Sequence, residues 1–497
     1  MNDPTPPTRL LFAPGDLRGA EAVNDAALVS ALGEVEAAWV EAQSRAGLIG
    51  EDVRAEAIAG IDAAIRSRLS DGTGLEDLAE AAESGGNPVI PFLTIVRDGL
   101  GPEASRALHR GLTSQDVLDS AFGLLVSRIV RGNIAALGVI CDSLAELSER
   151  YASALCLART LTQPALPTTF GLRAANWAAE VHDVLTLAPV VDAVQVGGAA
   201  GTRAAIREFA GESTETLLRE FHVQLRGPDA ALADPPVPWH GNRVRVLHWG
   251  SHLAQCVSVC STIARDVLIG VRPEIGEIAL SATGGSSAMP HKLNPTTAVL
   301  LHRNGMRAPA ALATLATATA ESVEERSDGA WHAEWPALAE LLTLSRSSLS
   351  LLEAMIAGLS ADTEAMRRNV DAASPGIISE RLSIALAGRL SKAQIQDALA
   401  AARESGGDAA DELEKALRSA AAEQPDTAEV QPGTAEGDAP SRGEIEELLR
   451  PENYLGDAEE IRRSILRSIS EAAPAATDPL FPDSQFSDPL FSDPKAF

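Results

Sequence analysis

Apolar residues recur every three or four positions along most of this chain, which is the period of an α-helix. The first such segment covers residues 21–48, where Leu28, Leu32 and Val35 share one helical face. Shorter helices follow up to about residue 105, interrupted by clusters of Gly, Asn, Asp and Pro that break a helix. The pattern predicts an N-terminal helical domain over residues 1–105.

Longer helices are predicted over the middle of the chain. The first begins at Thr113 and continues to about Tyr151, and Asp116 gives its start the pattern of a capping box. At 1.5 Å per residue this helix would be about 55 Å long. Helices of this length usually bury a face against one another, so we expect an elongated bundle over residues 106–358. Further helices of the bundle are expected at about 171–196, 241–271, 295–320 and 334–358.

The rest of the chain is expected to form a smaller helical domain over residues 359–470. A segment at about 421–442 is rich in Pro, Gly, Ala and acidic residues, which predicts a disordered insertion. The acidic tail, residues 471–497, repeats the tetrapeptide DPLF and is also predicted to be disordered. A short docking motif for a partner is the alternative for this tail.

Composition narrows the class of protein. The 497 residues include 69 acidic and 41 basic side chains, a net charge of −28, so nucleic acid and anionic membrane surfaces are poor partners. Ala and Leu dominate and aromatic residues make up 4%, which favours helix over sheet. We find neither a signal-peptide core nor an apolar run of about 20 residues, and we expect a soluble cytoplasmic protein. Four cysteines lack the spacing of a zinc site and are expected to be reduced core thiols: Cys141, Cys156, Cys256 and Cys260.

The stretch TGGSSAMPHKLNPTT, residues 283–297, departs most clearly from the helical pattern. Its two adjacent glycines let backbone amides approach a ligand closely. Asn294 and Pro295 predict a helix start with Asn294 as the N-cap, so the loop would carry its serines to the positive end of a helix beside Lys292. A serine hydroxyl there is a candidate for proton transfer, and the amides could hold an enolate. The alternative is a connection that only turns the chain, and composition alone does not decide between the two.

Other polar clusters lie at predicted helix ends. The segment HRGLTSQD places Thr113, Ser114 and Gln115 at a helix N-terminus, which is a ready anion site, although simple capping explains at least one hydroxyl. Basic residues gather in these clusters although the whole chain is acidic. A locally positive charge of this kind is what binding a polyanionic substrate requires. The clusters are 109–116, 158–171, 238–245 and 324–335, and with the loop their basic residues include His109, Arg110, Arg159, His240, Arg243, Arg245, His291 and Lys292.

Four motifs resemble those of one enzyme superfamily. GSSAMPHKLNP at 285–295 closely resembles the signature GSSxMPxKxNP of the fumarase/aspartase superfamily. The superfamily's other motifs are matched in order by HRGLTSQDVLDSA at 109–121, ARTLTQPALPTTFG at 158–171 and GGAAGT at 197–202. The resemblance covers residues from about 10 to 470, so it does not depend on one loop.

This resemblance implies an all-α, three-domain fold with a central bundle of long helices. It implies a homotetramer whose active sites are shared between subunits, with a small polycarboxylate as substrate. Superfamily reactions add or eliminate across a carbon–carbon bond next to a carboxylate, through an enolate-like intermediate, with no metal or organic cofactor. The serine after the loop glycine acts as the base, and here that residue is Ser286.

Within the superfamily the sequence most resembles the 3-carboxy-cis,cis-muconate cycloisomerases of protocatechuate (β-ketoadipate) catabolism, through SDGAWHAEWPAL at 327–338 and PENYLGDA at 451–458. Adenylosuccinate lyase is the alternative. Lyases of that type carry a histidine where this chain has Leu161 and a glutamate where it has Val299, so the acid for a nitrogen leaving group is missing. The cycloisomerase needs no such acid, because its leaving group in reverse is a carboxylate of the same molecule. A non-catalytic binding protein is a further alternative that the fold alone does not exclude.

The expected site follows from the loop and from the resemblance. Ser286 would deliver the proton in the lactone-forming direction, in a positive field from Lys292, and His109 is the competing proton donor. The expected substrate ligands are Thr113, Ser114, Gln115, Arg159, Gln163, His240, Arg243, Ser287, Met289, His291, Asn294, Trp331 and His332.

Overall fold

The structure is a computed structural model that describes residues 9–69, 72–189, 191, 194–226, 237–281, 284–285, 289, 292–423 and 440–472. Most of the predicted insertion and the tail from residue 473 therefore lie outside the described residues. The loop residues Ser286, Ser287 and His291 lie outside them as well.

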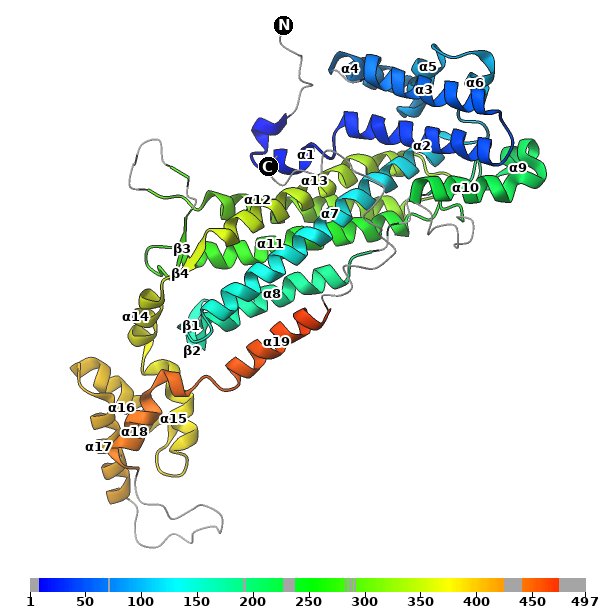
Figure 1. Cartoon of the computed structure of the whole chain (residues 1–497). Helices are drawn as coiled ribbons and strands as arrows, with labels where there is room; N and C mark the ends of the chain where they lie inside the picture. Colours follow the sequence, from blue (N-terminus) through cyan, green and yellow to red (C-terminus); the bar gives the residue numbers. More distant parts are fainter. Residues whose placement is uncertain are drawn as a thin grey trace.

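Long helices form the centre of the molecule (Figure 1). α11 packs against α12 and α13, and α7 packs against α8 and α13. The predicted all-α fold with a central bundle is confirmed. The bundle helices are α7 (Ser114–Arg150), α8 (Phe170–Thr186), α11 (Val244–Gly270), α12 (Thr296–Ala320) and α13 (Gly329–Ala357).

The longest helix begins as its sequence predicts. α7 has 37 residues and starts with a capping box in which the Thr113 amide donates to Asp116 at 3.0 Å. By length and apolar composition α7 and α11 resemble membrane-crossing helices, but more than half of each tested window is buried inside the bundle. α8 ends at Thr186, ten residues before the predicted end, because Pro189 cannot continue a helix.

The N-terminal region packs on one end of the bundle (Figure 1). α2 contacts α7, α10 and α3, and its apolar face shares one hydrophobic core with the first half of α7. The elements of this region are η1 (Arg9–Phe12), α1 (Leu17–Ala20), α2 (Asp25–Arg45), α3 (Glu51–Arg68), α4 (Gly72–Gly85), α5 (Val89–Arg97) and α6 (Pro102–Ala107).

Short elements connect the long helices. β1 (Leu155–Thr160) and β2 (Gln163–Thr169) form an antiparallel hairpin between α7 and α8, and β3 (Ile278–Leu280) pairs with β4 (Leu359–Ala361). Neither small sheet was predicted, because the first lies in a segment that reads as a polar cluster. The connection between α8 and α11 contains α9 (Ala204–Ala210), η2 (Gly211–Ser213) and α10 (Thr214–Arg226).

The C-terminal region lies at the opposite end of the bundle, except for its last helix (Figure 1). α19 packs against α8, and Arg462 is buried there with Glu149 at 3.1 Å. α19 thus belongs to the bundle by packing, although the sequence placed it in the C-terminal domain. The elements are α14 (Thr363–Ala373), η4 (Gly376–Ile378), α15 (Ser379–Ala385), α16 (Lys392–Ser405), α17 (Ala409–Glu423), α18 (Arg442–Leu449), η5 (Pro451–Asn453) and α19 (Ala458–Ala472).

Candidate active site

The predicted site residues lie at two ends of the bundle. The segments 109–116, 197–202 and 238–243 meet at the start of α7, and we call them the α7 N-terminal cluster. The β1–β2 hairpin follows the end of α7, and the start of α12, which follows the 284–295 loop, lies at the same end of the bundle (Figure 1); we call the hairpin and this loop the loop cluster. Since α7 has 37 residues, about 55 Å separate its two ends. One chain therefore does not bring all four motifs together.

Asp116 joins the three segments of the α7 N-terminal cluster. Its carboxylate accepts hydrogen bonds from the amides of Gly197 at 2.7 Å and Gly198 at 2.9 Å, and lies 2.8 Å from His240 Nε2. It also accepts the capping bond from Thr113. The other ring nitrogen of His240, Nδ1, is buried without a partner. His240, expected to bind substrate, is thus held in the cluster by Asp116, and its other ring nitrogen is enclosed.

Arg326 reaches the same cluster from the start of α13. Its guanidinium donates to Gln115 Oε1 at 3.0 Å, to Thr113 Oγ1 at 2.7 Å and to the Ala199 carbonyl at 3.2 Å. Ser114, at the first position of α7, is partly buried beside them. Arg326 was missed in the sequence, although it lies in the polar cluster 324–335.

His109 is held by a buried carboxylate from the N-terminal region. Its Nδ1 lies 2.7 Å from Glu36 Oε1, and its amide donates to Glu36 Oε2 at 2.9 Å. Glu36 is fully buried on α2, whereas 16% of the His109 side chain is exposed. The φ of His109 is +57°, which a residue with a side chain seldom adopts. Glu36 was missed in the sequence; the signal that could have revealed it is an acidic residue on the apolar face of α2.

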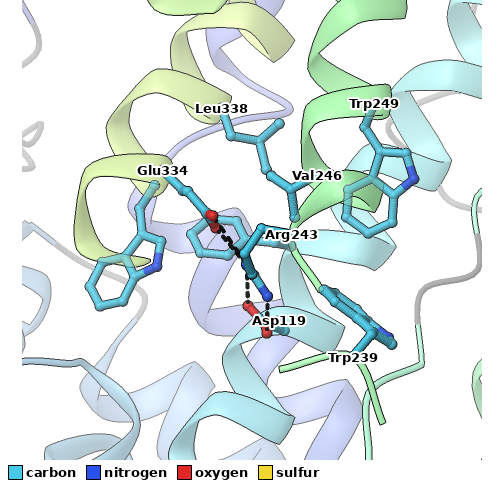
Figure 2. A pocket seen from close by; sticks show the side chains of 9 residues that line it. Asp119, Trp239, Arg243, Val246, Trp249, Glu334 and Leu338 are labelled. Carbon is cyan, nitrogen blue, oxygen red and sulfur yellow. Dashed lines mark hydrogen bonds and ion pairs between the residues drawn. The ribbon is translucent and has the colours of Figure 1, made fainter. Parts of the chain in front are cut away.

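Arg243 and Trp331 were expected to bind substrate, and the geometry instead places both in the interior. Figure 2 shows the guanidinium of Arg243 between two carboxylates. It donates to Asp119 at 2.8 and 3.1 Å and to Glu334 at 2.5 to 3.1 Å, while Trp331 Nε1 donates to Asp119 at 3.1 Å. Burial raises the pKa of Glu334, and the bonds and charge of Arg243 only partly oppose this rise. In this structure these residues bind one another.

His332 lies beside this group and faces solvent. Its Nε2 lies 2.8 Å from the Gly86 carbonyl and its Nδ1 lies 3.2 Å from the Asp328 carbonyl. The ring also stacks near Trp335, with centroids 4.6 Å apart. His332 therefore connects α13 to the N-terminal region in this structure.

The neck of the 284–295 loop is closed by Asn294. Its amide and carbonyl exchange hydrogen bonds with Gly284 at 2.9 and 2.8 Å, and its side chain donates to the Gly285 carbonyl at 3.3 Å. The prediction that Asn294 caps α12 was wrong, because Pro295 occupies the N-cap position and no side chain caps the helix. A side chain at position 284 would lie 2.2 Å from Thr296 Oγ1, which explains the glycine.

Lys292 and Met289 are exposed on the same loop. The Lys292 amide donates to the Met289 carbonyl at 3.0 Å, and 43% of Met289 is exposed. Both side chains can therefore meet a ligand or another subunit.

The β1–β2 hairpin holds Arg159 in an ion pair. Its guanidinium donates to Glu277 at 2.7 and 3.1 Å, and Asn369 donates to the same carboxylate at 2.8 Å. Burial alone would raise the pKa of Glu277, but these bonds hold it below its ordinary value. Arg159, expected to bind substrate, is thus engaged within the chain, whereas Gln163 is exposed at the hairpin turn. Glu277 was missed, because its partner lies 118 residues away in the sequence.

The four cysteines are free and buried, as predicted. Burial raises the pKa of Cys141 and of Cys256 to about 12. Such thiols are protonated at neutral pH and are poor nucleophiles. Among the described residues, no group of three or more His, Cys, Asp or Glu side chains is arranged to hold a metal ion.

The chain is similar in sequence to known lyases and cycloisomerases. A family profile described as lyase matches residues 18–309. Nitrosuccinate lyase of Streptomyces davaonensis is 35% identical over 446 residues, which cover 88% of this chain and 90% of the relative. The 3-carboxy-cis,cis-muconate cycloisomerase of Pseudomonas aeruginosa is 33% identical over 450 residues, again 88% and 90%. The crystal structure of the 3-carboxy-cis,cis-muconate lactonizing enzyme of Pseudomonas putida superposes with a TM-score of 0.77 at 28% identity, covering 93% of this chain and 99% of that one.

Proposed function

Because this chain belongs to the fumarase/aspartase superfamily of lyases, we propose that it interconverts 3-carboxy-cis,cis-muconate and 4-carboxymuconolactone. The observation that carries this proposal is the pair of apolar residues Leu161 and Val299. They are 96% and 50% exposed, at the positions where adenylosuccinate-type lyases carry the histidine and glutamate that protonate a nitrogen leaving group. A reaction without such a leaving group tolerates this loss, and lactone formation is such a reaction.

The proposed reaction is intramolecular. A substrate carboxylate adds to the alkene of the same molecule, which benefits from holding both groups in one bound conformer. The electron pair moves to the carbon next to a second carboxylate and gives an enolate-like state. Lys292 and the amides of the loop would stabilise this charge, and Ser286 or His109 would protonate the carbon.

A second candidate is supported by the relative at 35% identity, which acts on nitrosuccinate. Elimination from nitrosuccinate would release nitrite, which is a stable anion at neutral pH and needs no acid to leave. Leu161 and Val299 are compatible with this chemistry too. Elimination from adenylosuccinate releases an amine and lacks its acid here.

We further propose a homotetramer in which the α7 N-terminal cluster of one chain meets the loop cluster of another. The separation of the two clusters along α7 supports shared sites. A cytoplasmic location and a role in protocatechuate catabolism belong to the same proposal.

The test is ultraviolet absorbance with three substrates in parallel. Loss of the diene absorbance of 3-carboxy-cis,cis-muconate is expected with the wild type, with no turnover of adenylosuccinate. A Ser286→Ala variant run beside it asks whether the serine is essential. Release of nitrite from nitrosuccinate without diene loss would replace the proposal by the second candidate, and inactivity on all three would favour a non-catalytic role.

A further inference from the structure

A polar stripe crosses the otherwise apolar face of α2. Glu36, Trp39 and Gln43 are three and four residues apart, so they share one side of the helix, and all three are fully buried. Each side chain forms a hydrogen bond with the backbone of the short segment 107–110, which contains His109. The contacts are Gln43 Nε2 to the Ala107 carbonyl at 2.8 Å, the His109 amide to Glu36 at 2.9 Å and Trp39 Nε1 to the Arg110 carbonyl at 3.0 Å.

The stripe compensates an unfavourable backbone conformation. A φ of +57° is unfavourable for a residue with a side chain, and such strain persists only where surrounding contacts impose it. Glu36 provides the strongest of these contacts, because one carboxylate accepts both the amide and the ring N–H of His109. A buried carboxylate is itself costly unless it is hydrogen-bonded in this way.

The same contact selects the tautomer of His109. An ionised carboxylate only accepts hydrogen bonds, so Nδ1 carries the proton that faces Glu36. The other nitrogen, Nε2, is then the one that gains and loses a proton, and the side chain reaches the surface. A base oriented by a carboxylate behind it is a recurring arrangement in enzymes. His240 has a carboxylate partner too, but its free nitrogen is enclosed.

We propose that Glu36 is a positioning residue that directs His109 Nε2 at the reacting carbon. The inference rests on the proposed function. As the substrate carboxylate forms its bond to the alkene, the electron pair left on the neighbouring carbon takes the proton from His109 Nε2. In this direction His109 enters the reaction as the imidazolium, with a proton from solvent on Nε2. The C–O and C–H bonds form, the Nε2–H bond breaks, and the neutral ring keeps its Nδ1 proton in the hydrogen bond to Glu36. In reverse, Nε2 removes the same proton.

The Glu36→Gln variant tests this assignment. Its amide oxygen can accept the His109 backbone N–H, and its NH₂ group can donate to Nδ1, which forces the proton onto Nε2. Carbethoxylation by diethylpyrocarbonate needs an accessible nitrogen with a lone pair, and mass spectrometry of the peptide measures it at His109. In the wild-type protein we expect modification at His109, and in Glu36→Gln we expect the rate to fall about tenfold or more, because Nε2 loses its lone pair.

Turnover of 3-carboxy-cis,cis-muconate provides the second readout. Glu36→Gln is expected to lower kcat about 100-fold with little change in KM, because the proton transfer and not the binding is affected. Glu36→Asp keeps the carboxylate but draws it back by one methylene, and it should give smaller losses in both readouts.

Asn133→Ala is the matched control, since Asn133 is equally buried on α7 but bonds to Ser345. It should leave both readouts unchanged.

Several outcomes would overturn the proposal. These are a wild-type His109 that resists modification, equal modification rates in Glu36→Gln, a loss confined to KM, and an equal loss of kcat in the control. If the wild type turns over neither 3-carboxy-cis,cis-muconate nor nitrosuccinate, the proposed function fails. The modification rates then still decide whether Glu36 sets the tautomer of His109.

Discussion

The burial of His252 predicts that the fold loses stability in acid. Burial, with a smaller effect of the neighbouring His248, lowers the pKa of His252 from 6.5 to about 4. The unfolded chain therefore binds a proton between these values that the folded chain does not, so stability is complete above pH 6.5 and is lost as the pH falls toward 4. The loss amounts to about 3 kcal/mol. The free energy of unfolding, measured with urea at pH 7 and at pH 4, should therefore change less with pH in His252→Leu than in the wild type. His182→Gln, a change at a less buried position, should keep the pH dependence of the wild type.

The ion triad of Arg243 gives a second prediction for single residues. Two carboxylates surround one guanidinium, and all three groups are at least 97% buried. Arg243→Met should lower the free energy of unfolding by about 3–5 kcal/mol, because it leaves Asp119 and Glu334 buried without their partner. Urea unfolding at pH 7 measures this. An exposed pair such as Arg66 and Asp62 serves as the comparison, and Arg66→Met should change stability by less than about 1 kcal/mol. Similar losses in the two variants would contradict the structural role of the triad.

Contacts across long sequence separations also limited what the sequence could reveal about single residues. The capping box of Thr113 was predictable because its partner is three residues away. Glu36 lies 73 residues from His109, and Arg326 lies 211 residues from Gln115. No periodicity links residues so far apart, so the sequence found the ligand-like side chains but not the groups that hold them.

At the scale of elements, the β1–β2 hairpin stores strain in its turn. Leu161 and Thr162 have φ of +48° and +70°, a conformation that Asn and Gly adopt far more readily. Replacing the pair by Asn-Gly should raise the free energy of unfolding by about 1–2 kcal/mol. Urea unfolding tests this, with Leu187→Asn as the control, since Leu187 is an exposed leucine at φ −90°. Unchanged or lower stability of the Asn-Gly variant would show that the turn is not strained.

Helices were predicted better than their ends or the small sheets. The start of α7 was predicted correctly because local capping defines it. Asn294 failed as a cap because its backbone pairs with Gly284 and its side chain donates to the Gly285 carbonyl, so the helix begins one residue later. The hairpin was missed since six or seven residues per strand, rich in Thr and Pro, carry no clear alternation. α19 could not be assigned to the bundle, because only its packing against α8 reveals this.

At the scale of the whole molecule, the arrangement of motifs makes a prediction about assembly. His109 precedes α7, whereas Lys292 precedes α12, and the starts of these two helices lie at opposite ends of the bundle (Figure 1). If an active site needs both, it must combine two chains, and the enzyme in solution must be an oligomer. The chain mass is 51.9 kDa, so light scattering should give about 208 kDa for the proposed tetramer.

Subunit mixing tests the shared site directly. A His109→Ala protein and a Lys292→Met protein should each be inactive with 3-carboxy-cis,cis-muconate. When the two are dissociated in mild urea and reassembled together, random mixing should give about one site in four with both intact clusters, and about a quarter of the wild-type activity should return. Each variant reassembled alone is the control and should stay inactive. If the mixture stayed inactive while mass analysis showed mixed oligomers, each site would have to lie within one chain, and the loop would have to reach the start of α7 in a conformation different from this one.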